Sequence, residues 1–427
     1  MANEALDIDV LIFGGGVAGL WTRARLGLLG CSCVLVEKDA LGTGQTIASQ
    51  GIIHGGIKYA LTGRASRASA AIAGMPAIWE SCLRGRGEID LRSAHVLSER
   101  QYLWTTQGIG SRLVGAAVGR VIRTPVRRLR AAERPECFAK AGRGVDVYTV
   151  EERVLEPRSV VHALAEQAGG PIVRCAWVRE RDGVRLRGAI GSVVVRPRWV
   201  VLCAGEGNAE LARAFGEADL GTNGKNPPRS VGVSSKAPGQ QVRPLHMVMV
   251  RGALPEVFGH CVGVADRPRL TITSQTDVRG DAGTTVWYVG GEVAERGVDR
   301  DGAAQIAAAR AEIEACLGWV DLTGTEWAAM RVNRAEGTIA DGNGGERPDE
   351  PVVVRVGGGE GGVIVAYPTK LAFAPLLAER VVGLVRGPNA PVAQSGNRWQ
   401  GWDEEFRAFE RPLIAPLPWE REGVQWR

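Results

Sequence analysis

The start of the chain constrains the fold most strongly. An apolar run at residues 8–13 leads directly into a G-x-G-x-x-G turn at residues 14–19, and a helical pattern follows. In such a turn the first glycine permits a tight bend, the second lets backbone approach a pyrophosphate, and the third lets the helix pack close to the strand. A second apolar run, residues 33–36, ends in Glu37, where an acid that binds a ribose belongs. The segment predicts a βαβ unit that binds a dinucleotide at the helix N-terminus.

Composition narrows the class of protein. The chain has 427 residues, of which 45% are hydrophobic and 23% charged, which is enough for a large core and predicts two interleaved domains. The net charge of +5 is small for this length and does not favour nucleic acid as a partner. The eight cysteines show no C-x-x-C pair and no zinc spacing with histidine, so no metal site is expected.

The hydropathy pattern also bears on location. No window reaches the ~18 to 20 uncharged apolar residues that a membrane-spanning helix needs. Residues 1–7 contain neither a basic region nor an apolar signal core. We therefore expect no transmembrane segment and a cytoplasmic location.

Strand and helix patterns typical of nucleotide-binding units recur along the chain. They are found near the start, at residues 145–150 and 199–205, and again at residues 351–356 before a helical pattern at 368–385. Between them, β-rich runs separated by turns predict an antiparallel sheet. This alternation predicts one discontinuous domain that carries a second one. The expected dinucleotide domain comprises residues 1–88, 145–235 and 330–427, and the expected substrate or cap domain comprises residues 89–144 and 236–329.

Four segments carry a resemblance to a known family. They are the turn at 14–19 with Glu37, the Ser/Gly-rich run at 42–59 with its Ile-His-Gly-Gly turn, the strand and turn at 200–208, and the glycine cluster at 357–362. With these segments the chain resembles the D-amino-acid-oxidase superfamily of FAD-dependent oxidoreductases. Within it, the chain is most similar to FAD-dependent glycerol-3-phosphate dehydrogenases and L-2-hydroxyglutarate oxidases. The resemblance implies an α/β fold: a glutathione-reductase-like Rossmann FAD-binding domain with an inserted antiparallel β-sheet substrate domain of the α+β type.

The length of FAD explains why several segments are needed to bind it. A G-x-G-x-x-G turn covers only the pyrophosphate and adenosine, so the loop at 42–56 is expected to continue to the flavin ring. Val178, beside Trp177, is expected to contact adenine, and the cluster at 357–362 is expected to direct N–H groups at the flavin N1–C2=O edge. The expected cofactor-binding residues are Gly14, Gly16, Val17, Ala18, Gly19, Glu37, Lys38, Gly44, Gln45, Thr46, Ser49, Gln50, Gly51, Ile52, His54, Trp177, Val178, Ala204, Gly205, Asn208, Gly361, Gly362, Val363 and Lys370.

The resemblance implies hydride transfer to flavin N5 from a carbon that carries oxygen or nitrogen. This reaction needs a base or a pre-ionised substrate, and a cationic anchor if the substrate is an acid. His54 is the candidate in the flavin loop, and His246 and His260 are candidates in the β-rich insertion. Arg331 or Arg334 is the candidate anchor, because arginine binds a carboxylate or phosphate with two parallel hydrogen bonds. The family's Arg-Pro and Asp-Gly pattern is altered here, to Arg-Ala at 334–335 and an isolated Asp-Gly at 341–342.

Each candidate also has an ordinary structural interpretation. His54 can be a loop histidine that bonds backbone, the two strand histidines can be core residues, and Lys370 can be a surface lysine. A nicotinamide dehydrogenase would share the first turn but would not need the 42–56 loop. A flavin monooxygenase or halogenase remains the alternative function, although the late glycine cluster lacks the Asp usual in those families. A non-catalytic flavin-binding protein is the third hypothesis.

The expected partners follow from this chemistry. They are a small-molecule substrate, here a hydroxy acid, a polyol phosphate or an amino compound, and oxygen or a quinone-like compound as the electron acceptor. No nucleic acid is expected, and an oligomer is compatible with the sequence.

Overall fold

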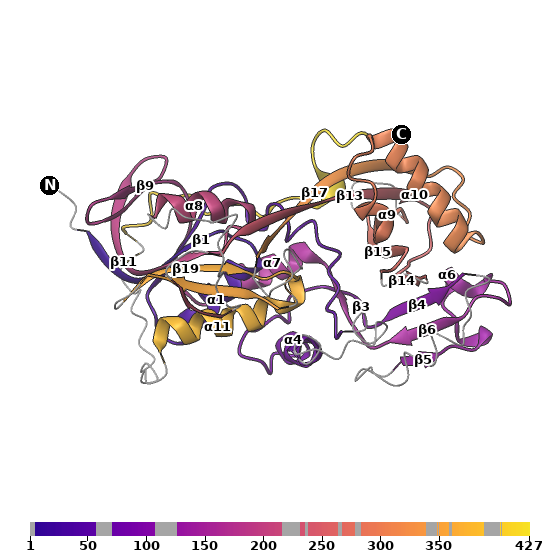
Figure 1. The fold of residues 1–427 in the computed structure, drawn as a ribbon, viewed down its shortest axis with the longest axis horizontal. Helices are drawn as coiled ribbons and strands as arrows, with labels where there is room; N and C mark the ends of the chain where they lie inside the picture. Colours follow the sequence, from indigo (N-terminus) through magenta and orange to yellow (C-terminus); the bar gives the residue numbers. More distant parts are fainter. Residues whose placement is uncertain are drawn as a thin grey trace.

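The computed structural model contains two large sheets, which lie side by side along its longest axis (Figure 1). The first sheet lies on the left in this view and the second on the right. The structure describes residues 5–56, 71–106, 126–215, 231–234, 238–263, 267–277, 283–338, 348, 350–357, 361–387, 402 and 404–427.

The first sheet is built on five parallel strands with the first strand of the chain at its centre. Their order is β8 (Ile172–Arg174), β2 (Cys33–Glu37), β1 (Leu6–Phe13), β11 (Ser192–Leu202) and β19 (Gly362–Tyr367). Strand β18 (Val352–Val356) pairs antiparallel with β19, and β12 (Val231–Ser234) pairs parallel with β18. Strands β9 (Ala176–Glu180) and β10 (Gly183–Arg187) form an antiparallel meander with β11. In open parallel sheets of this kind, ligands bind outside the carboxyl ends of the strands where the strand order reverses.

Helices cover both faces of this sheet. Helices α1 (Val17–Leu28), α7 (Pro157–Ala165) and α11 (Ala374–Arg386) pack on one face, and α8 (Asn208–Ala214) packs on the other (Figure 1). The alternation of β1 explains this arrangement. Val10 and Ile12 belong to the core with α1 and α11, whereas Leu11 and Phe13 belong to the core with α8.

The second sheet has eight strands, and its neighbours are antiparallel except for β14 and β4. Its order is β17 (Glu326–Gly337), β13 (Gln240–Gly252), β16 (Thr285–Gly290), β15 (Leu270–Thr276), β14 (Gly259–Val262), β4 (Gln101–Thr105), β6 (Val147–Val150) and β5 (Val126–Arg128). Helices α6 (Glu136–Ala139) and α10 (Gly302–Leu317) pack on one face. The opposite face contributes Met247, Met249 and Tyr288 to the core that it shares with the first sheet.

One predicted strand belongs to the other sheet. The sequence at 145–150 was expected to resume the nucleotide-binding pattern, but β6 pairs with β4 and β5 of the second sheet. The next strand of the first sheet is β8. A strand that is buried on both faces has the same apolar sequence pattern in either sheet. Because its hydrogen-bonded neighbour strands lie far away in the sequence, the pattern does not indicate which sheet it joins. Residues 107–125 of the expected cap domain lie outside the described residues.

The C-terminal segment, residues 404–427, contacts both sheets. Glu410 pairs with Arg174 of β8 at 2.5 Å, and Arg427 exchanges backbone hydrogen bonds with Trp327 of β17. The segment therefore ties the sheets together at their surface. Among the helices that the structure describes, none has the length and apolar character to cross a bilayer.

Candidate functional site

The glycine turn after β1 requires glycine at two positions because of backbone packing. A Cβ on Gly19 would lie 2.0 Å from the carbonyl oxygen of Gly14, so α1 can approach the strand only without a side chain there. Gly14 has φ of 106°, and a Cβ on it would lie 2.6 Å from the carbonyl oxygen of Cys203. The turn therefore places the start of α1 directly against the carboxyl ends of β1 and β11.

The groups around the start of α1 fit a pyrophosphate. The first turn of α1 carries no acidic residue, and Val17 N donates to Thr46 Oγ1 at 3.1 Å. Ser49 Oγ is buried and has no hydrogen-bond partner among the described residues, as expected for a hydroxyl that donates to a bound anion. Glu37 accepts from Gly15 N at 2.7 Å and holds the turn from the end of β2. A helix N-terminus with no carboxylate in its first turn suits a phosphate group.

The loop after β2 runs from this turn to the second sheet. Gln50 Nε2 donates to the carbonyl oxygens of Thr271, at 3.0 Å, and Tyr288, at 2.9 Å. Tyr288 Oη donates to the carbonyl oxygen of Ala48 at 3.1 Å. Gly51 has φ of 70°, and a Cβ on it would lie 1.8 Å from the carbonyl oxygen of Leu155. The loop is therefore fixed at both ends, first on α1 and then on β15 and β16.

A polar cluster lies where this loop ends. Glu152, between β6 and β7 (Val154–Leu155), accepts from Gly55 N at 2.5 Å through Oε1. Its Oε2 accepts from Gln101 Nε2 at 3.2 Å and lies 3.8 Å from His54 Nδ1. Glu152 is only 1% exposed, and burial raises the pKa of its carboxyl from 4.5 to about 7, against the opposing effects of the Gly55 and Gln101 hydrogen bonds and the charge of Lys370. We call His54, Gly55, Gln101, Glu152 and His260 the Glu152 cluster.

His260 joins this cluster from β14. Its ring stacks on that of His54, with centroids 5.8 Å apart and planes inclined by 21°. Its Nδ1 lies 2.8 Å from Thr271 Oγ1. Two of the three predicted histidines are therefore brought together, between the end of the loop and the face of the second sheet that points toward the first.

His246 and Arg331 are not brought to this cluster. His246 Nδ1 lies 2.9 Å from the carbonyl oxygen of Gly297, and Arg331 donates to the carbonyl oxygens of Val298 and Arg300. The two residues are paired across β13 and β17 beside the segment that leads into α10. Met247 and Met249, on the other face of β13, point toward the first sheet. The prediction of catalytic roles for His246 and Arg331 has no support in these contacts.

Arg334 also has contacts of its own. Its Nη2 lies 3.6 Å from Glu295 Oε1, and its side chain is 16% exposed. The ion pair links β17 to the short helix α9 (Glu292–Glu295). Nearby, Gln45 Oε1 accepts from Ala335 N at 3.0 Å and ties the start of the loop to the same strand.

The glycines at 361–362 are at the wrong end of the sheet for the predicted role. The turn before β19 contains Gly361, and the strand begins with Gly362 and Val363. Gly362 pairs with Trp199 of β11. The glycines therefore lie at the amino end of a parallel strand, opposite the glycine turn. The chain leaves the carboxyl end of β19 at 368–370, where Lys370 interacts with Glu152. Helix α11 begins at Ala374, after a 3-10 turn, and not at 368 as predicted.

Among the remaining predicted cofactor-binding residues, two have side-chain interactions within the protein. Asn208 accepts from Ala204 N at 2.7 Å and donates to the carbonyl oxygen of Ala366 at 3.0 Å, so it braces the turn after β11 against β19. Trp177 stacks on Phe215 at 5.4 Å. The others are described by their place in the chain, their backbone angle or their exposure. They are Gly16 and Ala18 at the start of α1, Lys38, which is exposed after β2, Gly44 and Gly205, which have positive φ, Ile52 in the core, and Val178 on β9, which is 41% exposed.

The sequence patterns did not indicate Glu152 or Gln101 as site residues. Glu152 is the second of two acidic residues that directly follow a buried strand. A charged residue immediately after an apolar run is typical of a functional group at the end of a strand. Its burial could not be inferred, because Gln101 and His54 reach it from distant parts of the chain. Residues 57–59, 341–342 and 358–360 of the segments used above lie outside the described residues.

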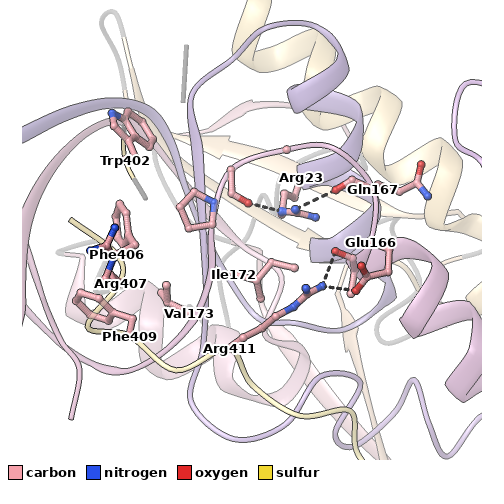
Figure 2. A pocket seen from close by; sticks show the side chains of 14 residues that line it. Arg23, Glu166, Gln167, Ile172, Val173, Trp402, Phe406, Arg407, Phe409 and Arg411 are labelled. Carbon is pink, nitrogen blue, oxygen red and sulfur yellow. Dashed lines mark hydrogen bonds and ion pairs between the residues drawn. The ribbon is translucent and has the colours of Figure 1, made fainter. Parts of the chain in front are cut away.

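A cavity of about 490 Å³ lies elsewhere (Figure 2). Figure 2 shows Arg23 of α1 on one wall, and on the other Trp402 together with Phe406 and Phe409 of the C-terminal segment. The cavity is also lined by the turn before β8, at the amino ends of the parallel strands. It is therefore separate from the candidate site. Among the described residues no group of three or more His, Cys, Asp or Glu has the geometry of a metal site.

The glycine turn, the fixed loop and the polar cluster at its far end fit an FAD-dependent oxidoreductase. The chain belongs to the FAD dependent oxidoreductase (DAO) family, whose family model matches residues 9–383. It is 40% identical over 421 residues to the probable FAD-dependent oxidoreductase PA4991 of Pseudomonas aeruginosa, covering 98% of both chains. The crystal structure of PA4991 matches with a TM-score of 0.75.

Two more distant structures show the same fold. Glycine oxidase from Geobacillus kaustophilus matches with a TM-score of 0.58 at 16% identity, covering 91% of this chain and 96% of that one. L-alpha-glycerophosphate oxidase from Mycoplasma pneumoniae, a structure with FAD bound, matches with a TM-score of 0.58 at 14% identity, covering 91% and 98%.

Proposed function

We propose that this enzyme oxidises a small hydroxy acid, polyol phosphate or amino compound by hydride transfer to flavin N5, and passes the electrons to oxygen or a quinone-like acceptor. The observation that carries the proposal is the course of the 42–56 loop. It starts on Thr46 at the N-terminus of α1 and ends in the Glu152 cluster at the second sheet. The loop thus links a pyrophosphate site to a set of proton-accepting groups.

The residues fit FAD in an extended arrangement. The glycine turn, Thr46 and Ser49 would hold the pyrophosphate, and Glu37 would reach a ribose hydroxyl. When bound, FAD supplies a ring that accepts a hydride. The backbone from His54 to Gly55 and the turn before Lys370 would line that ring, since both reach Glu152.

We propose a division of labour between the two sheets. The first sheet with its helices would be the FAD-binding domain, and the second sheet would cover the substrate. His260 and Thr271 would then face the substrate space from that second sheet. Relative to the boundaries expected from sequence, β6 and β17 move to the substrate domain because both pair within the second sheet.

An anaerobic screen of the flavin tests this function. We expect one class among hydroxy acids, polyol phosphates and amino acids to reduce the bound flavin without any nicotinamide cofactor. Reduction only by NADPH would instead support a flavin monooxygenase or halogenase. Bound FAD that none of these reagents reduces would support a non-catalytic flavin protein.

A further inference from the structure

The cavity in Figure 2 contains a buried arginine whose hydrogen bonds are incomplete. Arg23, in the middle of α1, is 5% exposed. Its Nε donates to the carbonyl oxygen of Gly170 at 2.7 Å, and its Nη2 donates to that of Gln167 at 3.1 Å. Its Nη1 is buried and has no hydrogen-bond partner among the described residues. Buried polar groups are almost always hydrogen-bonded, so this nitrogen is an exception that a bound acceptor would remove.

The turn before β8 fixes the orientation of the Arg23 guanidinium. The two bonded nitrogens, Nε and Nη2, share one edge of the planar group, so Nη1 lies away from that edge. Gly169 packs against the guanidinium, because a Cβ on Gly169 would lie 3.3 Å from Arg23 Cζ. A guanidinium that is held in place and still has N–H groups to donate suits an oxygen of a carboxylate or phosphate.

The charge of Arg23 favours an anion over a water molecule. Both of its acceptors are neutral carbonyl groups, and the carboxylate of Glu166, which also lines the cavity, pairs with Arg411 at 2.6 Å. Burial lowers the pKa of Arg23 to about 10, and the charge of Arg411 adds to this effect. A water molecule would satisfy Nη1 without compensating the buried charge, whereas an anion would do both.

The rest of the lining combines positive charge with aromatic rings. Arg407 and Arg411 line the cavity from the C-terminal segment. The ring of Phe406 has its centroid 5.5 Å from that of Phe409 and 6.3 Å from that of Trp402. The first residues of β8 add apolar side chains. The volume, about 490 Å³, is within the range of small-molecule sites, which is roughly 300–1,000 Å³.

We propose that this cavity is a second binding site, which takes a small anion with a flat aromatic ring. The carboxylate or phosphate of the ligand accepts from Arg23 Nη1, and Arg411, which is half exposed, attracts it at the entrance. The ring packs on Phe406 and Phe409. The cavity lies at the amino ends of the parallel strands, whereas the glycine turn lies at their carboxyl ends, so the inference does not depend on the proposed function.

Calorimetric titration of the flavin-loaded enzyme tests the chemistry of the ligand. The probes are benzoate, phenyl phosphate, inorganic phosphate and benzyl alcohol, which separate the anion from the ring. We expect benzoate or phenyl phosphate to bind at least about tenfold more tightly than the last two, without a change in flavin absorption. The tighter of the two identifies the anionic group. If neither binds, if inorganic phosphate binds as tightly, or if all binding changes the flavin absorption, the proposal is wrong.

Three variants test the position of the ligand. Arg23→Lys keeps the charge but loses the planar fork of donors, so the affinity should fall at least about tenfold. Arg411→Gln, at an exposed position, should weaken binding about threefold or more. Arg174→Gln is the matched control, because Arg174 pairs with Glu410 of the same segment at 2.5 Å and is not a lining residue of the cavity. It should bind as the wild type does.

Equal affinity in the wild type, Arg23→Lys and Arg411→Gln would overturn the proposal. Should Arg23→Lys fold poorly, Arg411→Gln and limited proteolysis of the wild type decide. The ligand lies between α1 and the C-terminal segment, so saturating ligand should slow cleavage of that segment in the wild type and in Arg174→Gln. Cleavage at the same rate with and without the bound ligand would contradict this position.

Discussion

At the scale of single residues, Glu152 is the most unusual group in the site. It is a carboxyl that is 1% exposed, with hydrogen-bond donors on both oxygens and a histidine beside it. Burial disfavours its charged form, so its pKa rises to about 7. The folded protein therefore holds a proton there at a pH at which the unfolded chain has lost it.

This difference predicts a pH-dependent stability. The folded pKa of about 7 exceeds the usual 4.5, so the stabilising effect of the proton is complete below pH 4.5 and is lost as the pH rises through 7. The full difference is roughly 3 kcal/mol. We expect the advantage of wild type over Glu152→Gln in urea unfolding to shrink by up to this amount between pH 5 and pH 8. Glu151→Gln should track the wild type, and parallel curves for all three proteins would contradict the pKa.

Gly19 gives a second prediction at this scale. In Gly19→Ala the new Cβ would lie 2.0 Å from the Gly14 carbonyl oxygen, so α1 must shift at its N-terminus. We expect a loss of about 1–3 kcal/mol in stability and less FAD bound per chain, measured by thermal unfolding and flavin absorption. Gly383→Ala in α11 is the matched control, because nothing lies within 4 Å of its Cβ. That variant should be stabilised by up to ~1 kcal/mol and bind FAD normally.

At the scale of helices and strands, local signals predicted much of the structure. The first βαβ unit is observed as α1 between β1 and β2, and the helical pattern at 368–385 is observed, with a later start, as α11. The first unit has a glycine turn of characteristic spacing, and α11 has apolar residues along one side. The glycine cluster at 357–362 was predicted to precede a helix, but it precedes strand β19. A glycine-rich turn has the same sequence pattern in both places.

The C-terminal segment gives a prediction for this scale. Glu420 is 4% exposed, and its two carboxylate oxygens lie 3.0 and 2.7 Å from Arg158 Nη1 of α7. Glu420→Gln should remove this ion pair and destabilise the segment by about 1–3 kcal/mol. Limited proteolysis should then cut the C-terminal segment earlier than in the wild type. The exposed Glu422→Gln is the control, and equal cleavage of the two variants would show that the ion pair does not fix the segment.

At the scale of the whole molecule, the site arises from contacts that no local pattern encodes. His54 comes from the loop after β2, Gln101 from β4, Glu152 from the end of β6 and His260 from β14. The sequence predicted His54 and His260, since both stand in segments with a recognisable pattern. It could not predict which face of β13 points toward the first sheet, because both faces of that strand are apolar.

The account depends on the proposed transfer of a hydride from a small substrate to a bound flavin. The most direct test is anaerobic mixing of the flavin-loaded enzyme with 2-hydroxy acids, polyol phosphates and the matching amines, followed by flavin absorption. The account predicts that one class of these compounds bleaches the flavin without any nicotinamide cofactor. A flavin that none of them bleaches, or that only NADPH bleaches, would contradict it.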